Sequence, residues 1–76
     1  MTIDEPISVG IVNDIPKYML WKGRNYRIDK IGLHHTFRKG EVYYHVFSAT
    51  SGTLFLSLSL DTKSLHWRLK EVSDAV

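Results

Sequence analysis

The chain is organised around one stretch, Trp21-Lys22-Gly23-Arg24-Asn25-Tyr26-Arg27-Ile28. A glycine among polar residues, with large side chains on both sides, is typical of a tight β-hairpin, because the reversal requires positive φ. Pairing across the Gly-Arg step is expected to place Trp21 opposite Tyr26 and Met19 opposite Ile28. These four side chains would then form one apolar face.

The chain is short, and its 76 residues fit one domain that buries only about 60% of the surface of the unfolded chain. It contains no cysteine, so disulfides and thiolate metal sites cannot add stability, and the 43% of apolar residues must supply the core. No apolar run approaches the roughly 18 residues of a membrane span, and the signal-peptide pattern is absent. We therefore expect a cytoplasmic protein without a membrane partner.

Charge is unevenly distributed, although the formal net charge is only +2. Residues 17–40 contain seven basic residues against one acidic residue, Asp29, whereas residues 1–16 contain three acidic residues and no basic one. Such segregation of charge affects the electric field around the protein and the kind of partner it attracts, but it does not determine the fold. It suits either a solvated basic loop face or a surface that meets an anionic partner.

The N-terminal segment predicts at most a short edge strand. Apolar residues alternate with smaller ones from Ile7 to Ile11, between two prolines that prevent a helix. We expect residues 1–5 to be flexible, residues 6–72 to form the single β domain, and residues 73–76 to fray.

The later strands are predicted to follow one another as an antiparallel meander. A bulge near Asp29-Lys30 is expected to correct the phase of the second hairpin strand, and Lys39-Gly40 is expected to form the next turn. The last turn is predicted at Asp61-Thr62-Lys63-Ser64. After it, Leu65 is expected to continue the buried face together with Trp67.

The turn near Thr50-Ser51-Gly52 decides which side of the sheet is core. Leucines occupy every second position of Leu54–Leu60, so the leucine side must be buried. A two-residue loop would place them beside His45 and Phe47, whereas a three-residue loop ending in glycine would place them beside Val46. We favour the three-residue loop, because it yields one consistent apolar face.

These patterns predict an all-β protein. We expect a small SH3-like barrel, or a strongly bent five-stranded antiparallel sheet, with room for an extra N-terminal strand. The alternative is an open meander sheet that dimerises through its outer face, so the chain is expected to be a monomer or a weak homodimer.

The segment Leu20–Ile28, taken with Leu60-Asp61 and the Trp67-x-Leu69 ending, resembles a family of small bacterial proteins of unknown function. That family carries a W-[RK]-G-R-x-Y-x-[VI] opening and a closing W-x-L strand, and the resemblance covers roughly residues 16–72. It implies a compact β fold and a bacterial origin. Because the family has no assigned activity, the resemblance assigns no catalytic residue.

The chemistry of the side chains indicates neither an enzyme nor a cofactor. The carboxylates fall mostly at predicted turns or termini, and the chain lacks a nucleophile elbow and a phosphate-binding glycine loop. His34 and His45 are expected to face each other, with His66 two strands away on the same side. Such imidazoles could in principle hold zinc, but no acidic ligand is expected near them, so we predict no metal site.

The chosen register also gathers aromatic and basic side chains on the outer face. Because bases stack on aromatic rings and Arg or Lys contacts phosphates, we predict a non-enzymatic binding module for single-stranded nucleic acid or another anionic partner, such as an acidic protein. The alternative is a peptide-binding or homodimerising domain, in which Phe47 and Phe55 would be covered. The predicted binding residues are Lys22, Arg24, Arg27, His34, Tyr43, His45, Phe47, Phe55, His66, Arg68 and Lys70.

Overall fold

A computed structural model describes residues 2–74, and within them the chain forms one seven-stranded antiparallel sheet. The strands are β1 (Thr2–Val12), β2 (Ile15–Trp21), β3 (Arg24–Arg27), β4 (Lys30–Lys39), β5 (Val42–Ser51), β6 (Leu54–Asp61) and β7 (His66–Asp74). Their order is β3-β2-β1-β7-β6-β5-β4, so β3 and β4 are the edges and the described sheet stays open between them. The all-β antiparallel prediction is confirmed, whereas the five-strand count and the closed SH3-like barrel are not what the structure has. None of the described residues belongs to a helix with the length and apolar character needed to span a membrane.

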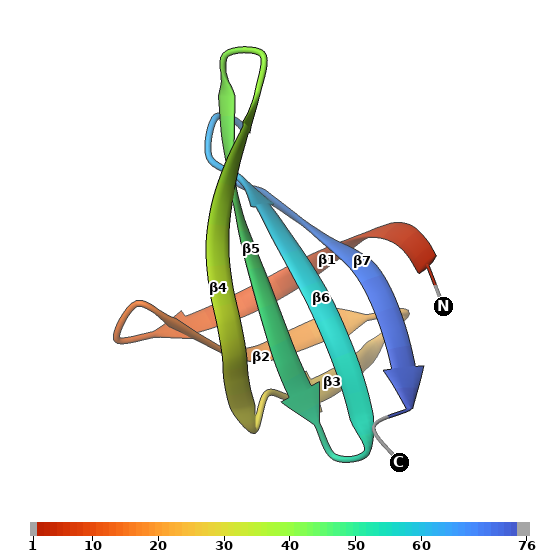
Figure 1. Cartoon of the computed structure of the whole chain (residues 1–76). Helices are drawn as coiled ribbons and strands as arrows, with labels where there is room; N and C mark the ends of the chain where they lie inside the picture. Colours follow the sequence, from red (N-terminus) through yellow and green to blue (C-terminus); the bar gives the residue numbers. More distant parts are fainter. Residues whose placement is uncertain (1, 75–76) are drawn as a thin grey trace.

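The strand β1 joins two layers of the sheet. Its first half pairs with β7, where Ile7 lies opposite Trp67, and its second half pairs with β2, where Ser8 lies opposite Leu20. In Figure 1, β1, β2 and β3 cross behind the other four strands. The expectation of an edge strand here is therefore wrong, because β1 has a partner on each side.

The ends of the described chain are strands. Residues 2–5, which were expected to be flexible, belong to β1, and Ser73 and Asp74, which were expected to fray, belong to β7. The same predictions for residues 1 and 75–76 lie outside the described residues.

The hairpin β2–β3 has the apolar face that its sequence predicts, with a shifted ladder. Its turn is Lys22-Gly23, both with positive φ, so Trp21 pairs with Arg24 and not with Tyr26. A shift of two positions keeps every side chain on its face. The rings of Trp21 and Tyr26 still lie 5.8 Å apart and pack against the core.

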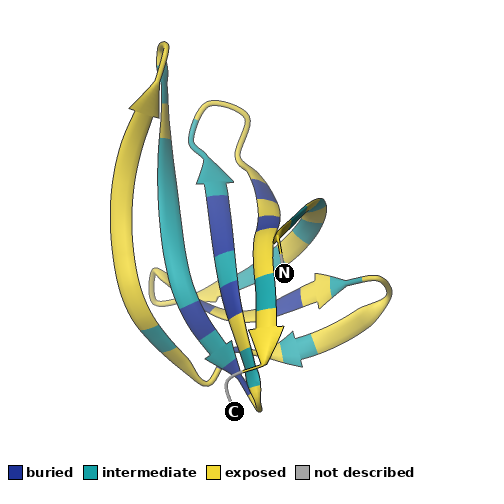
Figure 2. Cartoon of the chain, turned by 45° about the vertical axis from the view of Figure 1, so that its right-hand side comes forward, coloured by how far each residue is buried: buried dark blue, intermediate teal, exposed yellow. Residues whose placement is uncertain are grey.

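The core lies where the two layers cross. The first layer consists of β2, β3 and the second half of β1, and the second layer consists of β4 to β7. Met19 and Ile28 enter the core from the first layer. Leu56, Leu58 and Leu69 enter it from the second, and all five are buried. Figure 2 shows that buried positions gather on the inner strands of the second layer, whereas β4 is exposed along nearly its whole length. The fold therefore has one well-covered centre and one bare edge.

The turn between β5 and β6 is a two-residue loop, and the predicted three-residue loop is wrong. Ser51 pairs with Leu54, which leaves Gly52 and Thr53 as the loop, and Gly52 has a φ of 58°. Glycine at the first position of a two-residue turn meets the same backbone requirement as glycine at the end of a longer loop. The observed loop is one residue shorter than the predicted one, and a one-residue change of register exchanges the two faces of a strand. The leucines therefore share the inner face with Phe47.

The bulge predicted near Asp29-Lys30 is instead a break between β3 and β4. There the Asp29 N–H donates to the Thr50 carbonyl at 2.8 Å, and the Gly52 N–H donates to the Asp29 carboxylate at 2.7 Å. These bonds tie the crossing between layers to the β5–β6 turn. A bulge does occur in β4, at Gly32.

The turn between β6 and β7 exposes Leu65 and does not bury it as predicted. The Leu65 N–H donates to the Asp61 carbonyl at 2.7 Å, and Leu65 has a φ of 61° with 70% of its surface exposed. Because the turn includes this residue, β7 begins at His66. Trp67 and Leu69 are buried, as the sequence predicts.

Candidate anion-binding groove on the outer sheet face

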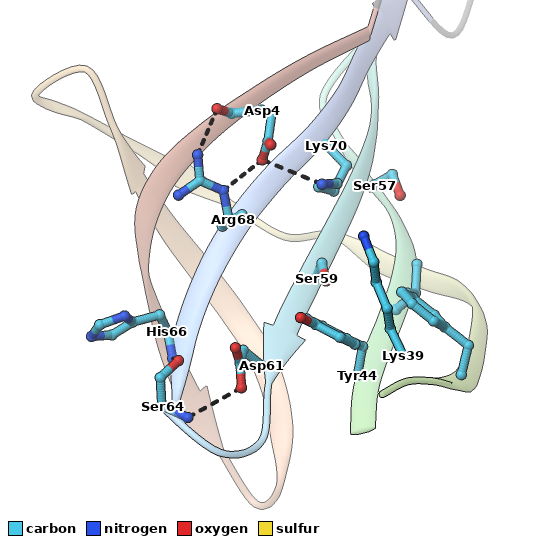
Figure 3. Close-up of a pocket in the computed structure, with 12 residues that line it drawn as sticks. Asp4, Lys39, Tyr44, Ser57, Ser59, Asp61, Ser64, His66, Arg68 and Lys70 are labelled. Carbon is cyan, nitrogen blue, oxygen red and sulfur yellow. Dashed lines mark hydrogen bonds and ion pairs between the residues drawn. The ribbon is translucent and has the colours of Figure 1, made fainter. Parts of the chain in front are cut away.

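A groove of about 580 Å³ lies on the outer face of the sheet, across β4, β5, β6, β7 and the start of β1 (Figure 3). Alternation along each strand brings the lining side chains to this face, opposite the buried leucines. The lining residues are Asp4, Phe37, Lys39, Tyr44, Val46, Ser57, Ser59, Asp61, Ser64, His66, Arg68 and Lys70. Of the predicted binding residues, the groove brings together His66, Arg68 and Lys70.

The centre of the groove holds a carboxylate between two cations. The Arg68 Nε donates to Asp4 Oδ1 at 2.5 Å, the Arg68 Nη2 donates to the Asp4 carbonyl at 2.8 Å, and the Lys70 Nζ lies 3.3 Å from Asp4 Oδ1. Figure 3 shows both cations converging on Asp4. The hydrogen bond from Arg68, followed by that from Lys70, lowers the pKa of Asp4. This arrangement orders Arg68 along the groove.

The sequence pattern did not single out Asp4. It lies in residues 1–5, which were expected to be flexible, and its meeting with Arg68 depends on the β1–β7 ladder, where Pro6 pairs with Arg68. The sequence did contain one signal for this contact, because the N-terminal segment is acidic and the last strand is basic.

A second carboxylate fixes one end of the groove. Asp61 Oδ1 accepts hydrogen bonds from the backbone N–H groups of Lys63 at 2.8 Å and Ser64 at 3.1 Å. The bond from Ser64 is the main cause that lowers the pKa of Asp61, and the bond from Lys63 adds to it. Asp61 therefore caps the turn that leads into His66 and stabilises the conformation of that turn.

Two aromatic rings form a stack on the wall of the groove. Phe37 on β4 and Tyr44 on β5 are cross-strand partners, with ring centroids 4.9 Å apart and an interplanar angle of 13°. Phe37 is 44% exposed, so its ring is accessible. The three-residue loop would have buried Phe37, which is why both rings were missed. The two-residue alternative places them on the outer face.

Four residues that were expected on the outer face lie on the inner face: His34, Tyr43, His45 and Phe47. His34 Nε2 and His45 Nδ1 are 2.7 Å apart and share a hydrogen bond, and the His34 ring is stacked on Phe47 with centroids 4.3 Å apart. Phe47 is half-buried and packs against the core, so its predicted place on the outer face is wrong. Since His66 lies on the opposite face, the three imidazoles cannot meet. Residues 2–74 contain no group of three or more His, Asp or Glu side chains arranged to hold a metal ion.

The remaining predicted residues lie away from the groove. Lys22 Nζ is 4.0 Å from Glu5 Oε2 and 5.2 Å from the centroid of the Trp21 ring. Tyr43 lies under Arg38, whose guanidinium carbon is 5.6 Å from the ring centroid. Three others are exposed outside the groove lining: Arg24, Arg27 and Phe55.

Comparisons with models of protein families, with curated proteins and with solved structures found no match. The groove itself offers two stacked rings, three cations and several hydroxyl groups along one open face. Stacked rings of this kind can contact flat groups, and the cations can contact anionic ones.

Proposed function

We propose that the protein is a non-enzymatic binding module whose outer groove takes single-stranded nucleic acid. The observation that supports this function is the Phe37–Tyr44 stack beside Lys39, Arg68 and Lys70 in one groove. An exposed ring on a β-sheet is a platform for an unpaired base, and stacking contributes about 1 to 3 kcal/mol per base. The neighbouring cations suit the phosphates.

The charge of the groove favours an anionic ligand. Three cations face two carboxylates, which is a formal excess of one positive charge. Arg68 and Lys70 share the single carboxylate of Asp4, and Asp61 is bound by the backbone of its turn. The Lys39 ammonium group makes no hydrogen bond or ion pair with a residue between positions 2 and 74, so its charge is open to a phosphate. An ordered Arg68 also loses less side-chain entropy on binding.

The acidic residues support binding over catalysis. The pKa of Asp4 and that of Asp61 are lowered from an ordinary value of 3.8 that already leaves a carboxyl ionised at neutral pH, so neither can serve as a general acid there. Both are also held by hydrogen bonds that a substrate would have to break. The groove is therefore proposed to bind its ligand without changing it.

The test is fluorescence anisotropy with a labelled oligothymidylate at two salt concentrations. If three cations meet phosphates, affinity should fall about 20-fold between 50 and 200 mM salt. Phe37→Ser should weaken binding at both salt concentrations, because a stacking surface is lost. Lys39→Ala should weaken binding mainly at low salt and reduce the salt slope.

The matched control is Lys17→Ala, which removes the same charge from β2, outside the groove. It should leave affinity nearly unchanged. No binding at 50 mM salt, or equal effects of Lys17→Ala and Lys39→Ala, would overturn the proposal.

A second candidate function is strand addition by a protein partner at the free edge of β4. Nine of the ten residues of β4 are exposed, and β5 is its only neighbour in the described sheet. Such an edge accepts an extended peptide through backbone hydrogen bonds. Because the strand has basic ends and no acidic residue, an acidic peptide suits it best. Oligoglutamate that perturbs β4 amides in nuclear magnetic resonance would support this function over the first.

A further inference from the structure

A second cavity, of about 440 Å³, lies on the inner face, opposite the groove. It is formed where the end of the β1–β2 hairpin meets the inner surface of β4 and β5. Its apolar lining consists mainly of Ile11, Ile15, Ile31, Phe47, Leu60 and Trp67. Volume and lining both fall in the range of small-molecule sites, which hold roughly 300 to 1,000 Å³ and carry few polar groups.

Asp14 supplies the only formal charge among the residues that line this cavity. It occupies the two-residue turn between β1 and β2 with a φ of 65°, a conformation that Asp and Asn tolerate better than other side chains. Its carboxylate makes no hydrogen bond or ion pair with another described residue. The turn thus holds an unpaired anion beside an apolar cavity.

The two histidines provide the other polar groups. Because His34 and His45 share one hydrogen bond of 2.7 Å, one ring donates and the other accepts. Whichever ring donates, the neutral pair keeps one further nitrogen with a free lone pair. The cavity therefore offers a carboxylate and an imidazole acceptor to a ligand that carries N–H donors.

Aromatic surfaces complete the cavity. The Phe47 ring lies between His34, at 4.3 Å, and Trp67, at 5.6 Å between centroids. Aromatic faces attract cations, whereas the carboxylate repels anions.

We propose that the inner cavity binds a small hydrophobic ammonium ion. Its apolar part lies among Phe47, Leu60 and Trp67, and its ammonium group lies at the rim near Asp14. This site uses the opposite face from the groove, so it is independent of the proposed nucleic-acid function.

The experiment is a titration of ¹⁵N-labelled protein with 2-phenylethylammonium, followed by nuclear magnetic resonance. Saturable shifts are expected at the Trp67 indole N–H and at the amides of Ile15 and Ile31. The neutral analogue 2-phenylethanol should bind more weakly, and the anion 3-phenylpropanoate should bind least. The three probes share a phenyl group, so their order reports the charge preference of the cavity.

Asp14→Asn tests the rim directly, since asparagine keeps the turn conformation and removes the charge. An exposed ion pair contributes only modestly to the free energy of binding. The variant should therefore bind the ammonium probe about five-fold more weakly and the alcohol equally well. The control Glu71→Gln removes a charge from an exposed residue of β7 outside the cavity lining and should change neither affinity.

Three results would overturn the proposal: no saturable shift at the cavity, equal binding of the anion, or an unchanged ammonium affinity in Asp14→Asn. The same variant should retain oligothymidylate binding. Loss of the ammonium site with retention of the groove, or the reverse, thereby separates the two proposals.

Discussion

Phe47 lies directly opposite Leu58 in the β5–β6 ladder, and its ring is 5.6 Å from that of Trp67. This single pairing assigns the odd-numbered residues of β5 to the core side and Tyr44 and Val46 to the groove. The core and the candidate site therefore lie on opposite faces of the same β5–β6 ladder, and the assignment of each face can be tested by substitution.

Phe47→Ser should destabilise the protein by about 3 kcal/mol, because it removes a large, half-buried apolar side chain that packs against the core. Phe55→Ser is the matched control, since Phe55 is 50% exposed on the outer face, and it should cost less than about 1 kcal/mol. Urea unfolding measures both values. Equal losses would contradict the assignment of faces.

Gly10 and Tyr18 should be energetically coupled. They are paired in the β1–β2 ladder, and a Cβ on Gly10 would lie 2.1 Å from Tyr18 Cε2. Gly10→Ala should therefore displace the ring, which is 49% exposed and can turn outward, at a cost of about 1 kcal/mol.

In the Tyr18→Ser background the ring is absent, and Gly10→Ala should be neutral or stabilising, because alanine loses less backbone entropy. A double-mutant cycle by thermal unfolding measures the difference. The coupling is disproved if Gly10→Ala has the same effect in both backgrounds.

Leu65→Gly should stabilise the protein by about 0.5 to 1 kcal/mol. Its φ of 61° is unfavourable for a leucine, and its exposed side chain contributes little packing. Leu33→Gly is the contrasting control, because Leu33 is 66% exposed but lies within β4, where glycine should destabilise. The expected signs are opposite in chemical denaturation, and a loss of stability in Leu65→Gly would refute the strain.

Acid should remove the stabilisation that Asp4 provides. Its pKa in the folded protein lies below the ordinary value of 3.8, so the unfolded chain binds more protons than the folded one in this range. The contribution is complete above about pH 5 and is lost as pH falls through the folded pKa. Asp4→Asn should therefore lower the melting temperature at pH 6 but not at the acid end of the range, as calorimetry would show. A pH-independent difference would mean that the ion pairs are not the cause.

The last strand, β7, shows how much of the candidate site can be predicted from the sequence. Alternation alone places His66, Arg68 and Lys70 on one face, away from Trp67, and the groove confirms that they lie together. Asp4 and the Phe37–Tyr44 stack could not be predicted in the same way. Their positions depend on pairing between distant strands, which local alternation does not encode.

By itself, the sequence determined the all-β class, the β2–β3 hairpin with its apolar face, and the alternation of most strands, because these follow from side-chain period and turn residues. Only the tertiary structure decided the place of β1 between β2 and β7 and the two-residue loop Gly52-Thr53. The local sequence suits loops of two or three residues equally. Burial of the leucines against Met19 and Ile28 selects one of them, and that choice determines which aromatic rings face a ligand.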